Sequence, residues 1–141
     1  DSHDWAGFRS IFADDAVFEM PVPPPQGHTD LKDVFTGGEP IKGGDAIIAW
    51  VSSRMDISRS AHIGYMPEIE ILTATEAKAL WGMEDIVRRP DKTIHGYGYY
   101  KERYANQNGT WRIKHWSLYY KSMEITGHTE LNHTPGRIVT P

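Results

Sequence analysis

The spacing of hydrophobic residues near the start of the chain predicts a short helix. Residues 4–13 carry apolar side chains three and four positions apart, which places them on one stripe made of Trp5, Phe8, Ile11 and Phe12. Asp4 is a suitable N-cap, because its carboxylate can accept a hydrogen bond from an amide of the first turn. We expect Asp14 and Asp15 to end this helix and residues 16–20 to form a short strand.

A second helix is predicted to begin at Gly43 and Gly44, with Asp45 as its cap. Its buried stripe has the same spacing and comprises Ile47, Ile48, Val51 and Met55. Between the helices, residues 21–27 contain four prolines, which cannot continue a ladder of backbone hydrogen bonds. We therefore predict a loop there.

After the second helix, apolar and polar residues alternate with the period of two that is typical of strands. This pattern predicts four long strands, at residues 61–72, 76–89, 93–106 and 110–124. Short connections with turn-forming residues join them, which indicates an antiparallel meander. Helices followed by a long meander predict an α+β fold in which a curved sheet wraps over the helices.

The last predicted strand has an irregular pattern. Trp111 and Ile113 lie on one face of a regular strand, whereas Trp116, Leu118 and Tyr120 lie on the other. An extra residue near positions 114–115 would bring all five side chains to the same face, so a β-bulge is predicted there.

The predicted strands also combine large and very small side chains, as the wall of a pocket does. Gly96 and Gly98 share a face with Tyr100, and the glycines open space beside the ring. Five Trp, seven Tyr and four Phe residues suit a cavity that is apolar and can still form hydrogen bonds. We expect a ligand to contact Met20, Trp50, Met66, Trp81, Met83, Trp116 and Leu118.

Composition excludes several classes of protein. The length of 141 residues suits a single domain spanning residues 1–141, and no apolar run approaches the roughly 18 residues of a membrane span. The net charge is -4 and the longest basic cluster is a pair, which argues against nucleic acid as a partner. We expect a cytoplasmic protein that binds a small hydrophobic molecule and neither nucleic acid nor a membrane.

No cofactor and no metal are expected. The sequence contains no cysteine, and its histidines lack the spacing of metal ligands; those weighed are His95, His115, His128 and His133. The glycine pairs lack the Lys and Ser or Thr of a phosphate-binding loop. The outer face of the sheet carries aromatic residues such as Tyr97 and Tyr99, so we expect a homo-oligomer, either a dimer or a trimer.

Several segments resemble the SnoaL-like and scytalone dehydratase-like proteins of the nuclear transport factor 2-like superfamily. They are DSHDW at 1–5, FADDAV at 12–17, GGDAI at 43–47, His62, RY at 103–104 and NGTWRI at 108–113. Their order and spacing cover nearly the whole chain except its C-terminal end. The resemblance implies a single SnoaL-like domain in which a cone-shaped antiparallel sheet, wrapped over N-terminal helices, encloses a cavity.

The resemblance also implies a catalytic pair. Asp1 stands where the resembling enzymes keep an aspartate in the first helix, and His62 stands where they keep the histidine that pairs with it. In those enzymes the histidine takes a proton from carbon while a leaving group departs from the adjacent carbon. A carboxylate on one ring nitrogen fixes the tautomer and makes the other nitrogen more basic.

Other positions depart from scytalone dehydratase. Its first cavity tyrosine would fall before residue 1, its second at Met20, and its second histidine near Arg88 and Arg89. Its cavity asparagine falls at about Tyr100, which leaves Tyr100 as a donor to a carbonyl or a departing hydroxyl. Scytalone is therefore not the expected substrate.

The residues alone leave two orientations open. By plain alternation His62 lies opposite Ile63 and Tyr65 and would point out of the core, unless a bulge at Gly64 or a kink at Pro67 turns it inward. Asp85 lies among apolar neighbours, so it is either a pocket carboxylate or a residue at the cavity mouth paired with Arg103.

Three functions follow as hypotheses. The first is a cofactor-independent lyase of the dehydratase type, acting on a hydroxylated polycyclic or aromatic substrate through Asp1, His62 and Tyr100. The second is an isomerase or cyclase of the ketosteroid isomerase type, with Asp85 as base and Tyr100 as oxyanion donor. The third is a non-catalytic ligand-binding or assembly subunit, which a His62 ring beyond hydrogen-bond reach of Asp1 would favour.

Overall fold

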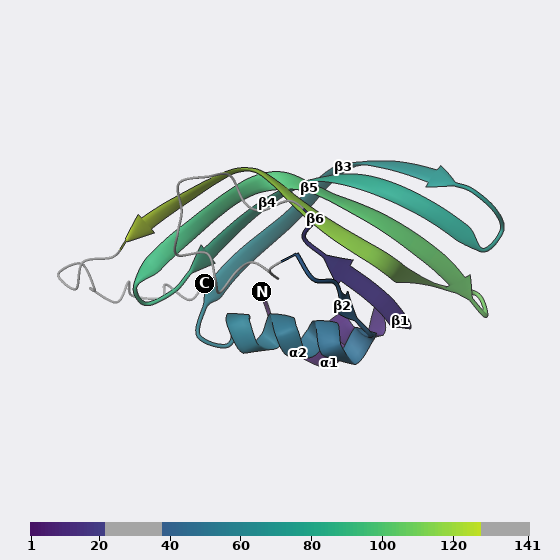
Figure 1. The fold of residues 1–141 in the computed structure, drawn as a ribbon, viewed down its shortest axis with the longest axis horizontal. Coiled ribbons are helices and arrows are strands. Elements are labelled where there is room, and N and C mark those ends of the chain that lie inside the picture. The colour runs from purple at the N-terminus through teal and green to yellow at the C-terminus, as the bar shows by residue number, and fades with distance from the viewer. Residues whose placement is uncertain (22–37, 128–141) are drawn as a thin grey trace, which may run out of the picture.

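The computed structural model describes residues 1–21 and 38–127, and in them a strongly curved sheet arches over two helices (Figure 1). Within these residues six strands form one sheet in the order β2-β1-β6-β5-β4-β3. This arrangement confirms the predicted α+β fold class. Most of the predicted proline-rich loop, together with His128 and His133, lies outside the described residues, and the extent of the domain stays a prediction.

The first helix is shorter than predicted. Helix α1 (Trp5–Ser10) begins at the expected cap, where the Asp4 carboxylate accepts a hydrogen bond of 2.9 Å from the amide of Gly7. It does not continue to residue 13, because Phe12 already belongs to β1 (Phe12–Glu19) and pairs with β6 (Thr110–Gly127). The buried side chains at the start of β1 therefore belong to the sheet, and Asp14 and Asp15 lie within that strand.

The second helix, α2 (Gly44–Met55), begins where the glycine pair predicted. Gly43 is its N-cap, with a φ of 98° that favours glycine, and the expected cap by Asp45 is wrong. Asp45 instead accepts a hydrogen bond of 2.6 Å from Arg9, which also binds Asp14 at 2.7 Å. The guanidinium thus links α1, α2 and β1, and this shared partner explains why Asp45 turns away from its own helix end.

The predicted meander is confirmed. It consists of β3 (Arg59–Ile71), β4 (Glu76–Arg88), β5 (Lys92–Gln107) and β6, paired antiparallel in sequence order. The sequence pattern did not predict how the remaining strands, β1 and β2, join the sheet. Strand β1 lies parallel to β6, and the two-residue strand β2 (Ile41–Lys42) pairs with β1 at the sheet edge.

Bulges determine which side chains face the helices. In the pairing of β5 with β6, Arg103 is opposite His115 and Tyr104 is opposite Ile113, so Lys114 is the extra residue that the parity of this strand predicted. In β3, two residues, Met66 and Pro67, lie between the pairs at Tyr65 and Glu68. This second irregularity changes the parity of β3 along its length and places His62 on the concave face.

The main core lies between the concave face of the sheet and α2. Its members from β1 and α2 include Phe12, Phe18 and Ile47, each at most 1% exposed. Burying a large apolar side chain contributes about 1.5–3 kcal/mol, so this layer accounts for much of the stability of the fold. The same layer fixes the distance between the helices and the sheet and hence the room left for a cavity.

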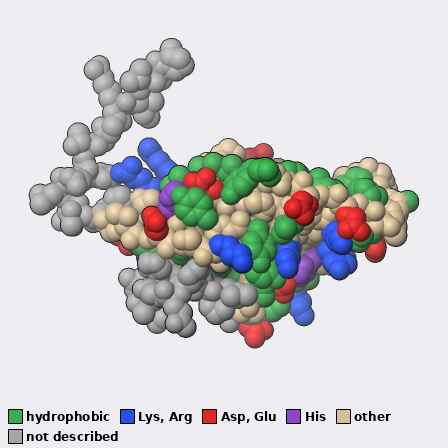
Figure 2. All heavy atoms as spheres, turned by 90° about the horizontal axis from the view of Figure 1, so that it is seen from above, with side chains coloured by type: hydrophobic (Ala, Val, Ile, Leu, Met, Phe, Trp, Pro, Cys, Tyr) green, Lys and Arg blue, Asp and Glu red, His purple; other side chains and the backbone are tan. Residues whose placement is uncertain are grey.

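The convex face of the sheet carries hydrophobic side chains among charged ones (Figure 2). Those at least one-third exposed include Ile63, Tyr65, Ile86 and Tyr97. In the part of the chain that the structure describes, no helix is both long and apolar enough to cross a membrane. The expected homo-oligomer stays a prediction.

Candidate active site

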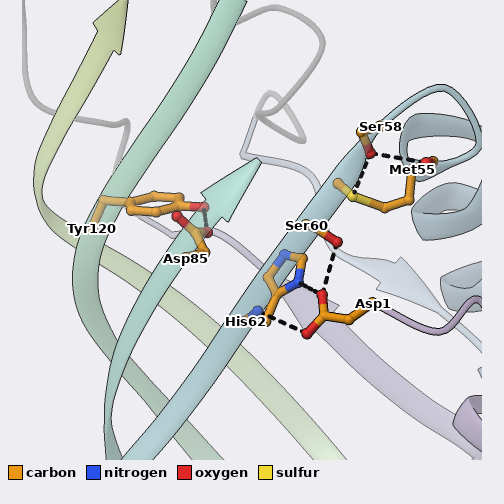
Figure 3. A network of polar contacts seen from close by, with 7 residues as sticks. All are labelled: Asp1, Met55, Ser58, Ser60, His62, Asp85 and Tyr120. Atoms are coloured by element: carbon orange, nitrogen blue, oxygen red, sulfur yellow. Dashed lines mark hydrogen bonds and ion pairs between the residues drawn. The ribbon is translucent and has the colours of Figure 1, made fainter. Parts of the chain in front are cut away.

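Asp1 and His62 lie side by side at the edge of the concave face. The N-terminal segment brings Asp1 against β3, where the Nδ1 atom of His62 lies 2.9 Å from Asp1 Oδ1 (Figure 3). Asp1 Oδ1 also accepts a hydrogen bond of 2.8 Å from the Ser60 hydroxyl, and Asp1 Oδ2 accepts one of 2.9 Å from the backbone amide of His62. Three contacts therefore hold one carboxylate in a fixed position.

This arrangement determines the tautomer of His62. A carboxylate accepts hydrogen bonds, so Nδ1 carries the proton that faces Asp1, and Nε2 remains with a free lone pair. The side chain of His62 is 34% exposed and that of Asp1 is 44% exposed, so solvent or a ligand can reach the pair. The imidazole is thus positioned to accept a proton at Nε2.

Burial lowers the pKa of His62, and the nearby carboxylate of Asp85 opposes this change. Because the net effect is a lower pKa, the ring is neutral at neutral pH and able to act as a base. Once the ring is protonated, both Asp1 and Asp85 stabilise its positive charge through their own negative charges.

Asp85 is the direct neighbour of His62 on the adjacent strand and is only 3% exposed. Its Oδ2 accepts a hydrogen bond of 2.5 Å from the hydroxyl of Tyr120, while Oδ1 is buried without a hydrogen-bond partner among the described residues. Burial raises the pKa of Asp85, although the bond from Tyr120 and the charge of His62 act against the rise. Of the two orientations predicted for Asp85, the structure has the one inside the pocket.

Tyr100 points to the same side of the sheet as Asp85. Burial raises the pKa of its phenol far above the usual value, with further contributions from Asp85 and Glu102. The hydroxyl is therefore protonated at neutral pH and can donate a hydrogen bond to an oxygen that gains negative charge.

A cavity of about 470 Å³ lies between the helices and the concave face of the sheet and includes both members of the pair. Helix residues such as Phe8, Val51 and Met55 form one wall, and Trp116 of β6 forms part of the other. A smaller pocket of about 70 Å³ continues from it past Asp85 and Tyr120. His62, Tyr100 and Trp116 line both spaces, so they stand at the junction. The volume of the 470 Å³ cavity suits a small organic ligand.

A larger hollow of about 710 Å³ lies elsewhere, mostly over the convex face, where charged residues such as Glu68, Lys78 and Lys101 surround it. It contains neither Asp1 nor His62. Size alone does not identify the site, so the cavity that contains the carboxylate–imidazole pair is the candidate site.

The predicted wall residues divide into three groups. Trp50, Trp116 and Leu118 line the cavity or its smaller extension. Met20 and Met83 are at most 1% exposed and pack inside the core rather than at the wall.

Two expected wall residues lie elsewhere. Trp81 donates a hydrogen bond of 3.1 Å from its indole nitrogen to the hydroxyl of Tyr104, and it lines neither the cavity nor its smaller extension. Met66 is 84% exposed and has a φ of 47°, because the β3 bulge turns it outward. The expectation that Met66 contacts a ligand in the cavity is therefore corrected.

The sequence analysis missed four residues of this site: Ser60, His3, Tyr120 and Glu102. Ser60 could have been found, because it precedes His62 by two positions and shares its strand face. His3 stacks on Trp5 at 5.1 Å and lines the cavity, and its Nε2 is buried with no hydrogen-bond partner in the described part of the chain. By strand alternation Glu102 shares the face of Tyr100, and Tyr120 shares the face of Trp116, so the sequence could also have placed these two residues on the inner face.

Among residues 1–21 and 38–127, no group of three or more His, Asp or Glu side chains is arranged to hold a metal ion. His95 and His115 each have one carboxylate partner, Glu84 and Glu19 respectively. The expectation of no cofactor stays a prediction.

Comparison with known proteins identifies the family of this chain and proteins of the same fold. The sequence model of the SnoaL-like domain family matches residues 1–117. No curated protein matches the sequence significantly. A scytalone dehydratase-like protein from Novosphingobium aromaticivorans superposes with a TM-score of 0.67 at 17% identity, covering 85% of this chain and 72% of that one.

Hexachlorocyclohexane dehydrochlorinases superpose equally well. The type 2 enzyme has a TM-score of 0.70 at 15% identity, over 98% of this chain and 84% of that one. The type 3 enzyme from Novosphingobium barchaimii has a TM-score of 0.67 at 15% identity, over 96% and 84%. At these identities the superpositions establish a common fold, and the chemistry must be argued from the site itself.

Proposed function

This chain belongs to the SnoaL-like domain family, and on that premise we propose that it is a cofactor-independent lyase of the dehydratase type. Its substrate would be a hydrophobic, hydroxylated molecule with aromatic or fused rings. The observation that carries this proposal is the contact of 2.9 Å between Asp1 and His62 Nδ1, beside a largely apolar cavity of about 470 Å³.

In the proposed reaction His62 acts as the base. Nε2 takes a proton from a carbon atom of the substrate, and the electrons of that C–H bond form a double bond to the adjacent carbon. The bond from the adjacent carbon to its hydroxyl oxygen breaks, and the oxygen leaves as water after it receives a proton from solvent. The proton taken by His62 returns to solvent, so the overall change is substrate to alkene plus water.

The neighbouring residues stabilise the charges that this reaction creates. Asp1 faces the side of the ring opposite to Nε2 and stabilises the imidazolium that forms. Tyr100 can donate a hydrogen bond to the departing hydroxyl or to a carbonyl that activates the C–H bond, because its phenol stays protonated. Exclusion of water by the aromatic wall strengthens both effects.

The names of the superposed enzymes support an elimination. A dehydratase removes water and a dehydrochlorinase removes hydrogen chloride, and both reactions take a proton from one carbon and a leaving group from the next. A base of the kind formed by His62 and Asp1 suits either leaving group. The hydroxyl is proposed here because the cavity offers a phenolic donor beside the base.

The proposal can be tested with a panel of fused-ring ketones that carry a hydroxyl group β to the carbonyl. Loss of water is followed by mass spectrometry. For a compound that reacts, His62→Ala is expected to lower kcat/KM by about 10²–10⁴-fold, the usual contribution of a positioned base. A His62→Ala protein that folds and keeps the wild-type rate would exclude this mechanism.

A matched control is available on the convex face. His95 also lies against a carboxylate, with Nε2 at 2.7 Å from Glu84 Oε1, but it lines none of the cavities described above. His95→Ala is expected to leave the rate within about twofold of the wild type, because the ring is remote from the substrate. Binding without any turnover across the panel would instead favour the non-catalytic hypothesis.

An isomerase with Asp85 as its base is the second candidate, and one observation favours it. Asp85 Oδ1 is buried beside the small pocket without a hydrogen-bond partner among the described residues, so it is available for a substrate proton. Under this alternative Asp85→Asn abolishes turnover and His62→Ala does not. Under the dehydratase proposal, His62→Ala abolishes turnover and Asp85→Asn does not.

A further inference from the structure

A second carboxylate faces the cavity at a distance from the Asp1–His62 pair. Glu102 lies on β5, two positions beyond Tyr100 and therefore on the same face, and its register partner on β6 is Trp116. Like Tyr100 and Trp116, it lines the cavity of about 470 Å³, and it also borders the separate hollow of about 710 Å³. None of the steps proposed above uses Glu102.

Aromatic residues hold Glu102 in place. The hydroxyl of Tyr104 donates a hydrogen bond to Glu102 Oε2, and the indole of Trp81 donates one of 3.1 Å to the Tyr104 oxygen. Burial raises the pKa of Glu102, while the bond from Tyr104 opposes the rise. The side chain is therefore a desolvated carboxylate with a fixed orientation, and its remaining lone pairs can accept further hydrogen bonds.

The Asp1–His62 pair and Glu102 lie well apart along the sheet. His62 pairs with Asp85, Asp85 pairs with Gly96, and Glu102 lies six residues further along β5. Much of the remaining cavity lining is apolar and includes Phe8, Phe12 and Trp116. A desolvated carboxylate at an apolar wall binds a hydrogen-bond donor more strongly than water-exposed carboxylates do, because charge-assisted hydrogen bonds gain strength away from solvent. A donor group on the ligand at this point would be recognised specifically.

We propose that Glu102 is a recognition residue that accepts a hydrogen bond from a hydroxyl group at the far end of the ligand. The ligand class is then an elongated fused-ring molecule with a hydroxyl at each end, one near His62 and the other at Glu102. The assignment of the reacting end to His62 rests on the proposed function, whereas the contact at Glu102 concerns binding alone. Tyr104 and Trp81 act as positioning residues for the carboxylate.

Matched ligands test the inference without any catalysis. Naphthalene-2,6-diol and anthracene-2,6-diol are compared with their dimethyl ethers, which have the same rings and no hydroxyl donor. Affinities for the wild-type protein and for variants are measured by calorimetry. Wild-type protein is expected to prefer a diol over its ether, and absence of this preference for both ring sizes would overturn the inference.

Variants at Glu102 should remove the preference selectively. Glu102→Leu is expected to weaken diol binding about tenfold or more, the usual effect of losing a hydrogen bond to a charged group. It should leave the ether within about twofold, since the ether makes no such bond. Glu102→Gln keeps the shape and one acceptor oxygen but loses the charge, so a smaller loss of about threefold is expected.

A purely structural role would give a different result. If Glu102 only supports Tyr104, its variants would weaken diol and ether alike, and this outcome would overturn the inference. Glu84→Gln is the matched control, because Glu84 is a carboxylate paired with an aromatic ring on the opposite face of the sheet. It should leave the preference for the diol unchanged.

The result is separable from the test of the proposed function. Should His62→Ala retain turnover while Glu102 variants lose the diol preference, the dehydratase mechanism fails and the recognition site stands. Should His62→Ala abolish turnover while Glu102 variants bind diol and ether as the wild type does, the mechanism stands and this inference fails.

Discussion

Tyr120 on β6 donates a hydrogen bond of 2.5 Å to Asp85 on β4, although β5 runs between the two strands (Figure 3). The contact is possible because the intervening residue of β5 is glycine. A Cβ atom at Gly96 would lie 2.4 Å from both Asp85 Oδ1 and Tyr120 Cε1. Gly96 therefore permits this contact between strands, in which Asp85 is only 3% exposed.

Removing the hydroxyl of Tyr120 should destabilise the protein. In Tyr120→Phe the buried Asp85 loses its hydrogen-bond donor, so the free energy of unfolding should fall by roughly 1–3 kcal/mol. Urea unfolding measures the change. The neighbouring Tyr119→Phe is the control, because that ring stacks on Tyr99 at 4.8 Å, and it should change stability by no more than about 0.5 kcal/mol. Equal losses in the two variants would contradict the role given to this bond.

Asp85→Asn should alter how stability depends on pH. Burial raises the folded-state pKa of Asp85 above the usual value of 3.8, so the folded protein favours the protonated carboxyl. The stabilising contribution is complete below the unfolded pKa and is lost as pH rises through the folded pKa. Asparagine does not ionise and still accepts the bond from Tyr120. The stability of Asp85→Asn relative to wild type should therefore increase as pH rises from about 4 and then level off, whereas a difference independent of pH would refute the argument.

The rate of the proposed reaction should fall at low pH. His62 must be neutral to accept a proton, and burial lowers its pKa from the usual value of 6.5. The pH profile of kcat/KM should therefore show an acid limb with its midpoint below 6.5 and a plateau through neutral pH. Burial raises the pKa of Tyr100, so loss of the phenolic proton should not lower the rate up to about pH 9. An acid limb centred above 6.5 would indicate a different base.

The contacts around Asp1 should contribute unequally to the rate. Asp1→Asn removes the charge that stabilises protonated His62, so kcat should fall by about 10²-fold. Ser60→Ala removes only one of three contacts to the same carboxylate, and a loss of about threefold is expected. Steady-state kinetics should show these losses in kcat with little change in KM. A Ser60→Ala effect as large as that of Asp1→Asn would mean that the hydroxyl acts directly.

Gly98→Ala should strongly destabilise the sheet. A Cβ atom there would lie 1.8 Å from the backbone oxygen of Tyr119, so β5 and β6 could not keep their pairing at this position. A loss of roughly 3 kcal/mol or more is expected in thermal or urea unfolding. Gly127→Ala is the control, because no atom of residues 1–21 or 38–127 outside its chain neighbours lies within 4 Å of the added carbon, and it should be neutral to within about 0.5 kcal/mol. Gly98→Ala with wild-type stability would show that the strands can separate there without loss.

Much of the fold follows from local patterns. Alternation over the second half of the chain predicted β3 to β6 to within a few residues, because each strand has one buried and one exposed face. The bulge at Lys114 was also predictable, since aromatic residues on both parities cannot all face one core. The end of α1 was not, because Phe12 and Ala13 are apolar in a helix and in a strand alike.

The site was predictable in part. Asp1 and His62 came from the resemblance to scytalone dehydratase-like proteins, and their contact of 2.9 Å joins residues 61 positions apart in the chain. Alternation alone left His62 on either face, because the deciding feature is the irregularity at Met66 and Pro67. Met66 itself was misplaced for the same reason.

By itself, the sequence determined the period and length of the strands, the start of both helices and the absence of thiol chemistry, since these depend on neighbouring residues and on composition. Only the tertiary structure decided which carboxylates share the cavity with His62. Tyr120 reaches Asp85 across a glycine of β5, and the irregularity in β3 brings His62 to the face of the sheet that carries Asp85 and Glu102. Each inserted residue reverses the direction of the side chains that follow it in a strand. The pairing register between strands therefore decides which face a side chain occupies, and the local sequence pattern does not.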